Sequence, residues 1–289
     1  MFLHIVLVKI NVHHIFIVMA KNNSKDIEAK TAESLVSFLP GEFLNEVAEM
    51  SRFTGQFFKS VLQRPLEIKE TMRQSFNTGN KSLSLVAITG LIMGVVLTIQ
   101  TRPTLARFGA ESLIPGMIAV SIVREIGPVI TALICAGKIG SGIGAELASM
   151  KVTEQIDAME VSGINPFKYL VVTRVLATTL MIPLLVMFAD FIAFIGGYFG
   201  INILGDVSFR FFFTQIFNVL DFSDLIPAVI KTFFFGFIIG IVACYKGYNA
   251  TKGTEGVGRA ANSAVVISSL CIFIMDAIAV QLTSLLTHH

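Results

Sequence analysis

Five ionisable side chains lie inside long apolar stretches of the chain. A charge left unpaired in hydrocarbon costs several kcal/mol, so such side chains usually pair, contact water or line the route of a substrate. We expect Lys231 and Asp276 to pair with each other. The five residues are Arg124, Glu125, Asp190, Lys231 and Asp276, of which Asp190 is the weakest candidate for a site.

Four of these residues are expected to line a water-accessible cavity that opens toward the outer membrane surface. At 1.5 Å per residue, Glu125 would lie roughly 18 Å, and Lys231 roughly 9 Å, from the outer ends of their spans. Two structural alternatives stay open: snorkelling of the Lys231 ammonium to the interface, and structural ion pairs between helices for Arg124 and Glu125. The cavity residues are Arg124, Glu125, Lys231 and Asp276.

A polar segment, Ala145–Pro166, interrupts two long apolar blocks and keeps a helical period. Val152, Ile156 and Met159 recur at i, i+4 and i+7, which predicts one amphipathic helix that ends near Gly163 and Pro166. Anionic headgroups repel such an acidic helix, so it suits a groove on a protein. A solvated loop is the alternative. The charged residues are Glu146, Lys151, Glu154, Asp157 and Glu160.

Other chemistry is disfavoured by the residues present. The glycine-rich run Gly137–Gly144 matches neither G-x-x-x-x-G-K-S/T nor G-x-G-x-x-G, so it does not predict a nucleotide site. There is no H-E-x-x-H, no Ser-His-Asp arrangement and no histidine within the spans. Three cysteines lack metal-ligand spacing and are expected to be reduced packing residues. We therefore expect no enzyme activity, no metal, no cofactor and no nucleic-acid partner.

The composition predicts an all-α integral membrane protein. The chain is 54% hydrophobic and 15% charged, whereas soluble domains carry about 25% charged residues; its mean hydropathy is +0.74. Five segments are long enough to cross the hydrocarbon. The third is over-long, so we expect it to tilt or to split near Pro183 or Gly196-Gly197. The segments are Leu83–Gln100, Leu113–Gly137, Tyr169–Gly200, Leu225–Tyr245 and Ser263–Leu286.

Three parts of the chain are expected to differ in organisation. Residues 1–40 form an N-terminal extension that is predicted to be loose and lacks the features of a signal peptide. Residues 41–82 hold an amphipathic helix, Glu42–Arg64, and a linker. Its aromatic apolar stripe favours a helix lying in the membrane interface, although packing on protein is as common. Residues 83–286 form the five-span domain.

Lysine and arginine side chains in the short loops predict the orientation of the spans. They concentrate before the first span and in the loops after the second and fourth spans. We therefore expect a cytoplasmic amino terminus, a cytoplasmic acidic segment and an external carboxyl terminus. The basic residues of the two cytoplasmic loops include Lys138, Lys151, Lys168, Lys246, Lys252 and Arg259.

Pairs of glycines four residues apart recur along the spans. Such pairs let helix backbones approach closely, although chance pairs also occur in a glycine-rich membrane protein. Tight helix packing, within the chain or between subunits, is expected at four pairs: Gly90 with Gly94, Gly140 with Gly144, Gly196 with Gly200, and Gly236 with Gly240.

Three motifs in the same order resemble the MlaE-family (YrbE-type) permeases, the membrane subunits of ABC lipid transporters that work with MCE-domain proteins. The motifs are Val123–Val129, Ala136–Ser141 and the segment from Ala145-Glu146 through Met159, and Asn165-Pro166 and Lys246-Gly247-Tyr248 also fit. The resemblance covers about residues 45–286.

This resemblance implies a homodimeric permease with an interfacial helix and five spans, in a bacterial inner membrane or a plastid. It implies that a cytoplasmic ABC ATPase subunit, with or without a small STAS-type protein bound to it, docks on a coupling helix at Glu146–Gly163. It also implies an MCE-domain partner outside the membrane and phospholipid in the cavity lined by the four charges above. The expected coupling residues are Glu146, Lys151, Glu154, Gln155, Asp157, Met159 and Glu160.

Two other functions stay open. Glu125, Lys231 and Asp276 would also suit an ion- or proton-coupled secondary transporter, which would need no ATPase and leaves the acidic segment unexplained. A structural membrane anchor is the second alternative, and it would hold no lipid in the cavity.

Overall fold

The computed structural model describes residues 41–63, 67–203, 205–251 and 253–287. The chain divides into two units, with the boundary between Phe53 and Thr54. The predicted extension at 1–40 lies outside the described residues. Helix α3, Gly41–Val61, occupies most of the predicted amphipathic segment; its position in the membrane interface stays a prediction.

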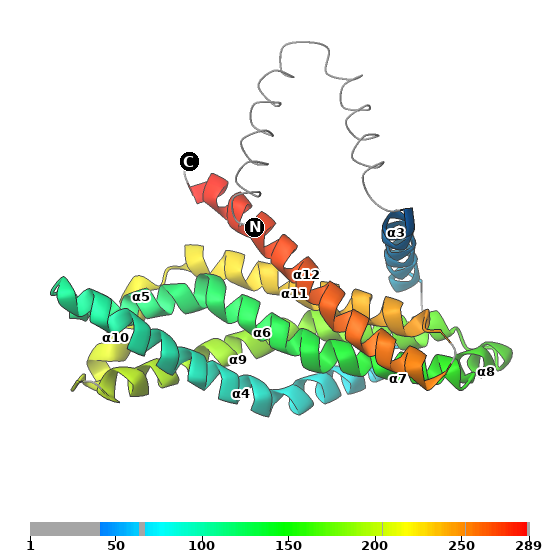
Figure 1. Ribbon diagram of the computed structural model, residues 1–289, viewed down its shortest axis with the longest axis horizontal. Coiled ribbons are helices and arrows are strands. Elements are labelled where there is room, and N and C mark those ends of the chain that lie inside the picture. The colour runs from blue at the N-terminus through cyan, green and yellow to red at the C-terminus, as the bar shows by residue number, and fades with distance from the viewer. Residues whose placement is uncertain (1–40, 64–66, 204, 252, 288–289) are drawn as a thin grey trace, which may run out of the picture. The chain divides into compact units, whose positions relative to one another are not determined.

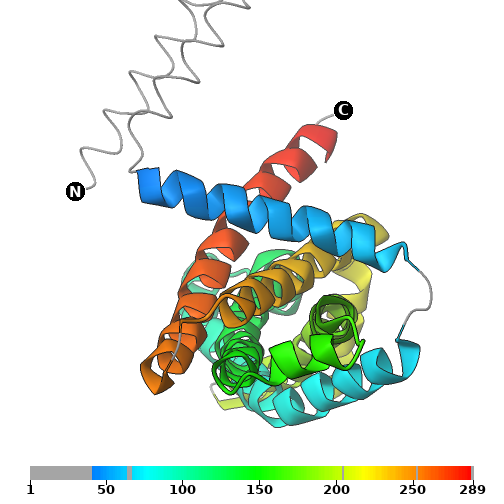
Figure 2. The same ribbon diagram turned by 90° about the vertical axis from the view of Figure 1, so that its right-hand side faces the viewer.

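All regular structure in the described part of the chain is helical. Five helical segments are long and apolar enough to cross a membrane, which confirms the predicted all-α membrane fold (Figure 1). Figure 2 views these helices more nearly along their axes. The five segments are Ile68–Arg107, Glu111–Val152, Phe167–Ile203, Phe222–Tyr248 and Thr254–Leu285.

The first long helix, α4 (Ile68–Arg107), begins well before the predicted span at Leu83. Residues 68–82, which we assigned to the linker, therefore belong to the same helix. A stripe of mostly small buried residues recurs every three or four positions and runs without a break from this polar part into the apolar part, so one face packs along the whole helix. The stripe comprises Ser75, Gly79, Ser82, Val86, Gly90, Met93, Gly94 and Thr98.

The second span contains two π-helical segments. It runs through η1 (Glu111–Leu113), α5 (Ile114–Ser121), η2 (Ile122–Ile126), α6 (Gly127–Cys135), η3 (Ala136–Gly140) and α7 (Ser141–Val152). Segment η2 has a local cause: Pro128 has no N–H, and its ring would clash with the Arg124 carbonyl in a regular α-helix. The Gly127 N–H instead donates to the Ile122 carbonyl, five residues back.

The third span begins with a π-helical segment, η4 (Phe167–Val172), and continues as α9 (Thr173–Ile203). Helix α9 passes through Pro183 and Gly196-Gly197 without interruption, so the predicted split does not occur. Its glycines face α4. A Cβ at Gly90 would lie 2.7 Å from the Ala189 carbonyl oxygen, and one at Gly200 would lie 3.0 Å from that of Val95. The α4–α9 interface is the most extensive in the bundle.

An additional helix, α10 (Phe209–Val219), follows the third span and was not predicted as a separate element. Its N-cap is Ser208, whose hydroxyl accepts a hydrogen bond from the Phe211 N–H. Phe212 and Ile216 are fully buried in a core shared with Ile118 and Ile122. Helix α10 thus covers the second span near its η1 end, next to the start of α11 (Phe222–Tyr248).

The glycine pair of α11 packs directly on the backbone of α9. A Cβ at Gly236 would lie 2.6 Å from the Thr178 carbonyl oxygen, and one at Gly240 would lie 2.9 Å from Val175 Cα. Neither position has room for a methyl group unless α9 moves. Gly236 and Gly240 therefore pack as tightly as we expected, and they join the fourth span to the third.

The glycine pair at the junction of η3 and α7 packs more loosely. The nearest atom to a Cβ at Gly140 is Ile239 Cγ2 at 3.6 Å, an ordinary van der Waals distance, so Gly140 makes no close backbone contact within the described part of the chain. A Cβ at Gly144 would lie 3.2 Å from the Ala264 Cβ of α12 (Thr254–Thr287), a closer but still side-chain contact. Here side chains, not backbone, face the glycines, and periodicity along one helix does not distinguish the two cases.

The polar segment between the second and third spans is broken into two helices. Helix α7 ends at Val152, and α8 covers Gln155–Val161. This corrects the single helix that we expected over 146–163. The break lies at Glu154, whose backbone is left-handed with a φ of 59°. The predicted end of the segment agrees with the structure, because Gly163 has a φ of 77° and Pro166 precedes η4.

Candidate functional site

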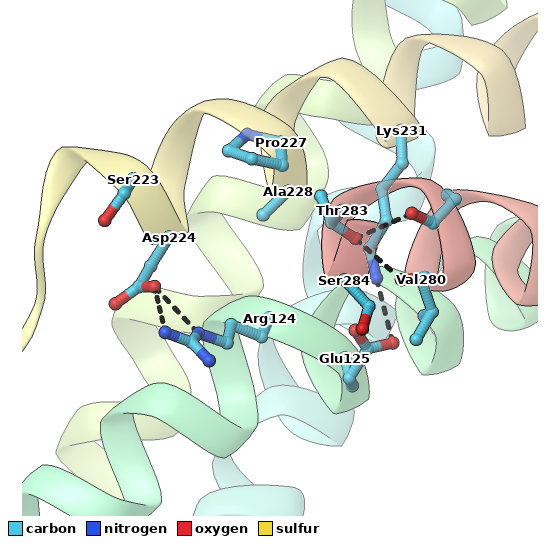
Figure 3. A pocket seen from close by; sticks show the side chains of 11 residues that line it. Arg124, Glu125, Ser223, Asp224, Pro227, Ala228, Lys231, Val280, Thr283 and Ser284 are labelled. Atoms are coloured by element: carbon cyan, nitrogen blue, oxygen red, sulfur yellow. Dashed lines mark hydrogen bonds and ion pairs between the residues drawn. The ribbon is translucent and has the colours of Figure 1, made fainter. Parts of the chain in front are cut away.

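A cavity of about 320 Å³ lies between the start of α11, segment η2 and the last turns of α12. Figure 3 shows the charged side chains of η2 and α11 meeting in it, with α12 forming the third wall. It contains three of the four predicted cavity residues, and the fourth, Asp276, bonds to one of them. The lining residues are Arg124, Glu125, Ser223, Asp224, Pro227, Ala228, Lys231, Ala279, Val280, Thr283 and Ser284.

Lys231 is the centre of a three-residue ion pair. Its Nζ donates to Glu125 Oε2 and to Asp276 Oδ1, each at 3.0 Å. The structure therefore pairs Lys231 with Asp276 as expected, and adds Glu125. The lysine side chain is only 6% exposed, so its ammonium does not snorkel to the surface. One cation here balances two carboxylates from two different spans.

Arg124 bonds to a residue that the sequence analysis missed. Its Nε lies 2.8 Å from Asp224 Oδ1, and its Nη2 contacts the same oxygen. The arginine side chain is 56% exposed and the aspartate 6%. Arg124 and Glu125 thus form the interhelical ion pairs of the structural alternative, each with α11, and both also line the cavity.

Helical spacing would have identified Asp224. Asp224, Ala228 and Lys231 stand at i, i+4 and i+7 and so share one face of α11. The same spacing on α12 joins Asp276 to Val280 and Thr283. Asp224 stands one residue before the predicted span Leu225–Tyr245, so it was not among the intramembrane charges. In the structure Asp224 is the third residue of α11 and part of its capping box with Asp221.

Asp190 lies beside segment η2, not in the cavity lining. Its Oδ1 is buried without a hydrogen bond, and it occupies the space that a side chain at position 127 would need. Gly127 therefore accommodates the Asp190 carboxyl next to the π-helical segment that carries Arg124 and Glu125. Asp190 therefore has a packing role beside η2, which the sequence pattern did not indicate.

The acidic segment lies at the far end of α11 from the cavity, because Gly247 packs against Gly144 and Leu147 of α7. Lys151 Nζ donates to Asp157 Oδ1 at 2.8 Å across the break between α7 and α8. Arg174, a buried residue of α9, donates to Glu146 Oε1 at 2.9 Å. Each carboxylate is more than half exposed: 55% for Asp157 and 54% for Glu146.

The remaining predicted coupling residues share this surface. Glu154, Gln155 and Glu160 are exposed, and Met159 is partly exposed. Two apolar side chains that we did not single out are also exposed: Val161 at 91% and Ile164 at 47%. Exposed apolar residues rimmed by charge are typical of protein-binding surfaces. The sequence signal that would have pointed to Val161 and Ile164 is their position directly after the acidic helical segment.

Comparison with known proteins identifies the family. The sequence model of the Permease MlaE family matches residues 71–282. The chain belongs to the MlaE permease family. This confirms the resemblance drawn from the three motifs, and the match includes the cavity residues and the acidic segment.

Several relatives of this MlaE permease carry related names. A probable ABC transporter permease protein of Rickettsia felis is 40% identical over 242 residues, covering 83% of this chain and 93% of the relative. One of Synechocystis is 37% identical over 223 residues, covering 77% and 85%. The chloroplastic protein TRIGALACTOSYLDIACYLGLYCEROL 1 of Arabidopsis thaliana is 32% identical over 256 residues, covering 89% and 73%. The chain is accordingly an ABC transporter permease of the MlaE family, an integral membrane protein with a transport role.

Proposed function

We propose that this permease moves phospholipid between the membrane and an external MCE-domain partner, driven by a separate cytoplasmic ATPase. The observation that carries the proposal is a cavity within the membrane-spanning bundle, where the charged side chains of Arg124 and Glu125 are about half exposed. Arg124 offers a guanidinium suited to a lipid phosphate, and the surrounding spans are apolar enough to accommodate acyl chains. Family membership and the name of the chloroplastic relative support a lipid substrate.

The α7–α8 region is the proposed docking surface for the ATPase. It combines exposed carboxylates with the exposed apolar side chains of Val161 and Ile164. Two contacts would carry a push from this surface into the bundle: the Glu146–Arg174 ion pair leads to α9, and the packing of Gly247 on α7 leads to α11. Since α11 also carries Asp224 and Lys231, movement at one end would alter the cavity at the other.

The rest of the proposed assembly follows the resemblance. The chain would act as a homodimer with its amino terminus and α7–α8 in the cytoplasm of a bacterial inner membrane and its carboxyl terminus in the periplasm. The basic residues of the α7–α8 and α11–α12 loops support this orientation. Helix α12, the least buried of the five spans, leaves an apolar surface for a second copy. A STAS-type protein would bind the ATPase, not this chain.

Docking is tested by reversing charge at Glu154 and Asp157 together, to lysine. We expect the ATPase to be lost from the purified complex, because two carboxylates of the docking surface become cations. Glu111→Lys, which reverses an exposed carboxylate at the other end of the bundle, is the matched control and should retain the ATPase. Retention by the double variant would remove α7–α8 from the docking surface.

Lipid handling is tested with Arg124→Ala. We expect slower transfer of labelled phospholipid in a reconstituted complex and less co-purified phospholipid, with the ATPase still bound. Unchanged lipid occupancy would remove Arg124 from the site. Cysteine labelling of the α7–α8 region in intact cells tests the orientation, and labelling from the outer side would overturn it.

One arrangement favours a second candidate, an ion- or proton-coupled transporter. Lys231 bonds to both Glu125 and Asp276 within the membrane, and such charge clusters occur in proton relays. Transport that follows an ion gradient and needs no ATPase would support this candidate. Transport that stops when ATP is withheld, whatever the gradient, would support the ATPase-driven permease.

A further inference from the structure

The cavity holds more negative than positive charge. The charged residues that line it or bond to its lining are two cations, Arg124 and Lys231, and three carboxylates, Glu125, Asp224 and Asp276. With each group in its ordinary ionisation state, the set has a formal charge of −1. A second copy of the chain would repeat the same set, so dimerisation would not reverse the sign.

Only two of these five groups are substantially exposed. The side chains of Arg124 and Glu125 are 56% and 45% exposed, whereas those of Lys231 and Asp224 are 6% exposed and that of Asp276 is 17%. A molecule in the cavity therefore meets one guanidinium and one carboxylate on adjacent residues of η2. Figure 3 shows Arg124 directed toward Asp224 and Glu125 beside Lys231.

Lys231 is poorly available as a second anion site. Its ammonium lies 3.0 Å from two carboxylate oxygens. A phosphate that displaced the two carboxylates from the Lys231 ammonium would leave Glu125 and Asp276 without a cation. Unpaired charges are costly in a low-dielectric setting. Arg124 differs, because its exposed guanidinium has further donors beyond those that contact Asp224.

We propose that the headgroup site of this cavity selects zwitterionic phospholipids over anionic ones. The lipid phosphate bonds to Arg124 and the amine-derived cation of the headgroup faces Glu125. An anionic lipid supplies the phosphate but no cation, so it adds negative charge beside Glu125, which shares the single Lys231 ammonium with Asp276. This inference rests on the proposed function and specifies its substrate class.

The test uses the full chain in detergent, equilibrated with phosphatidylethanolamine and phosphatidylglycerol of identical acyl chains. Bound lipid is counted by native mass spectrometry. We expect phosphatidylethanolamine to exceed phosphatidylglycerol by roughly two- to fivefold, the range given by a partly exposed charge pair. Phosphatidylcholine should also exceed phosphatidylglycerol, because its headgroup carries the same charges.

Two variants separate the site from the general charge of the protein. Glu125→Gln removes the carboxylate that faces the headgroup cation, and it should bring the ratio close to one. Glu111→Gln removes an exposed carboxylate outside the cavity lining, and it should leave the ratio unchanged.

The outcomes distinguish this inference from the proposed function. A preference of the unmodified chain for phosphatidylglycerol, or an unchanged ratio in Glu125→Gln, overturns the zwitterionic selection while leaving lipid transport intact. A ratio that falls equally in Glu111→Gln overturns it as well. Retention of no phospholipid by the unmodified chain overturns both.

Discussion

The two ends of the five-span bundle differ in how deeply their ion pairs are buried. At the α7–α8 end the carboxylate is the exposed member, with Glu146 54% and Asp157 55% exposed. At the cavity end Asp224 is the buried member of its pair, 6% exposed beside a 56% exposed Arg124, and Lys231 and Asp276 are both largely buried, at 6% and 17%. The α7–α8 end thus presents carboxylates to its surroundings, whereas the cavity end covers Asp224 with a guanidinium, holds Asp276 beside a buried ammonium and exposes a carboxylate at Glu125.

This difference predicts how each end responds to mutation. Exposed ion pairs contribute little to stability, and salt screens them. Breaking a buried pair leaves an uncompensated charge and is strongly destabilising. Changes at the cavity end should therefore reduce stability, whereas changes at the α7–α8 end should mainly affect binding.

The largest effect is expected for Lys231→Met. It leaves Glu125 and Asp276 facing each other without a cation, at a cost of about 3–5 kcal/mol in the free energy of unfolding. Unfolding in detergent measures this cost. Lys151→Met, which breaks the exposed pair with Asp157, is the control and should cost less than about 1 kcal/mol. Equal losses in the two variants would contradict the comparison.

Should Lys231→Met fail to fold, a double variant still tests the prediction. Asp276→Leu added to Lys231→Met removes one of the two stranded carboxylates. It should recover part of the lost stability, because less charge remains unpaired. No recovery of folded protein would count against a charge-based explanation.

A smaller effect is expected for Gly127→Ala, which tests the support of η2. The added methyl group would collide with the Asp190 carboxyl, at a cost of about 1–3 kcal/mol. Gly137→Ala is the matched control in the same span, since nothing lies within 4 Å of its added Cβ. Asp190→Ala should relieve the collision, so the double variant should lose less stability than the sum of the single changes.

Glu154→Gly should stabilise the chain by up to about 1 kcal/mol. Its φ of 59° costs an L-residue other than glycine about that much, and the greater freedom of glycine in the unfolded chain offsets part of the gain. Glu160→Gly, within the right-handed helix α8, should destabilise by about 0.5–1 kcal/mol. Equal effects of the two glycines on the unfolding midpoint would argue against strain at Glu154.

The smallest effect is expected for Asp157→Asn. It removes an exposed pair with Lys151 and should cost about 0.2–1 kcal/mol, a difference that vanishes near 1 M salt. Asp224→Asn alters the buried partner of Arg124 and should keep most of its cost at the same salt concentration. The two salt titrations together measure how differently the ends are screened.

The sequence predicted the elements that depend on composition and helical period. Hydropathy located all five spans, and the cost of burying charge identified Lys231 and Asp276 as partners. It did not predict the break at Glu154, because a left-handed residue other than glycine has no signature in an otherwise helical pattern. Asp224 was missed because the expected span began one residue after it. The Gly127–Asp190 contact depends on how two spans pack, which periodicity along one helix does not report.

The glycine contacts distinguish α4, α7, α9 and α11, which pack backbone to backbone, from α12, which packs through side chains. Added Cβ atoms on glycines of α4, α9 and α11 would lie within 3 Å of atoms in α4, α7 or α9, whereas the closest such approach between α12 and another helix is 3.2 Å, from Gly144 to Ala264. Helices that meet backbone to backbone resist separation, because even a methyl group has no room between them. We therefore expect α12 to be the wall of the cavity that moves most easily. An amphiphile would then enter sideways from the bilayer by displacing α12, without separating the helices that meet backbone to backbone.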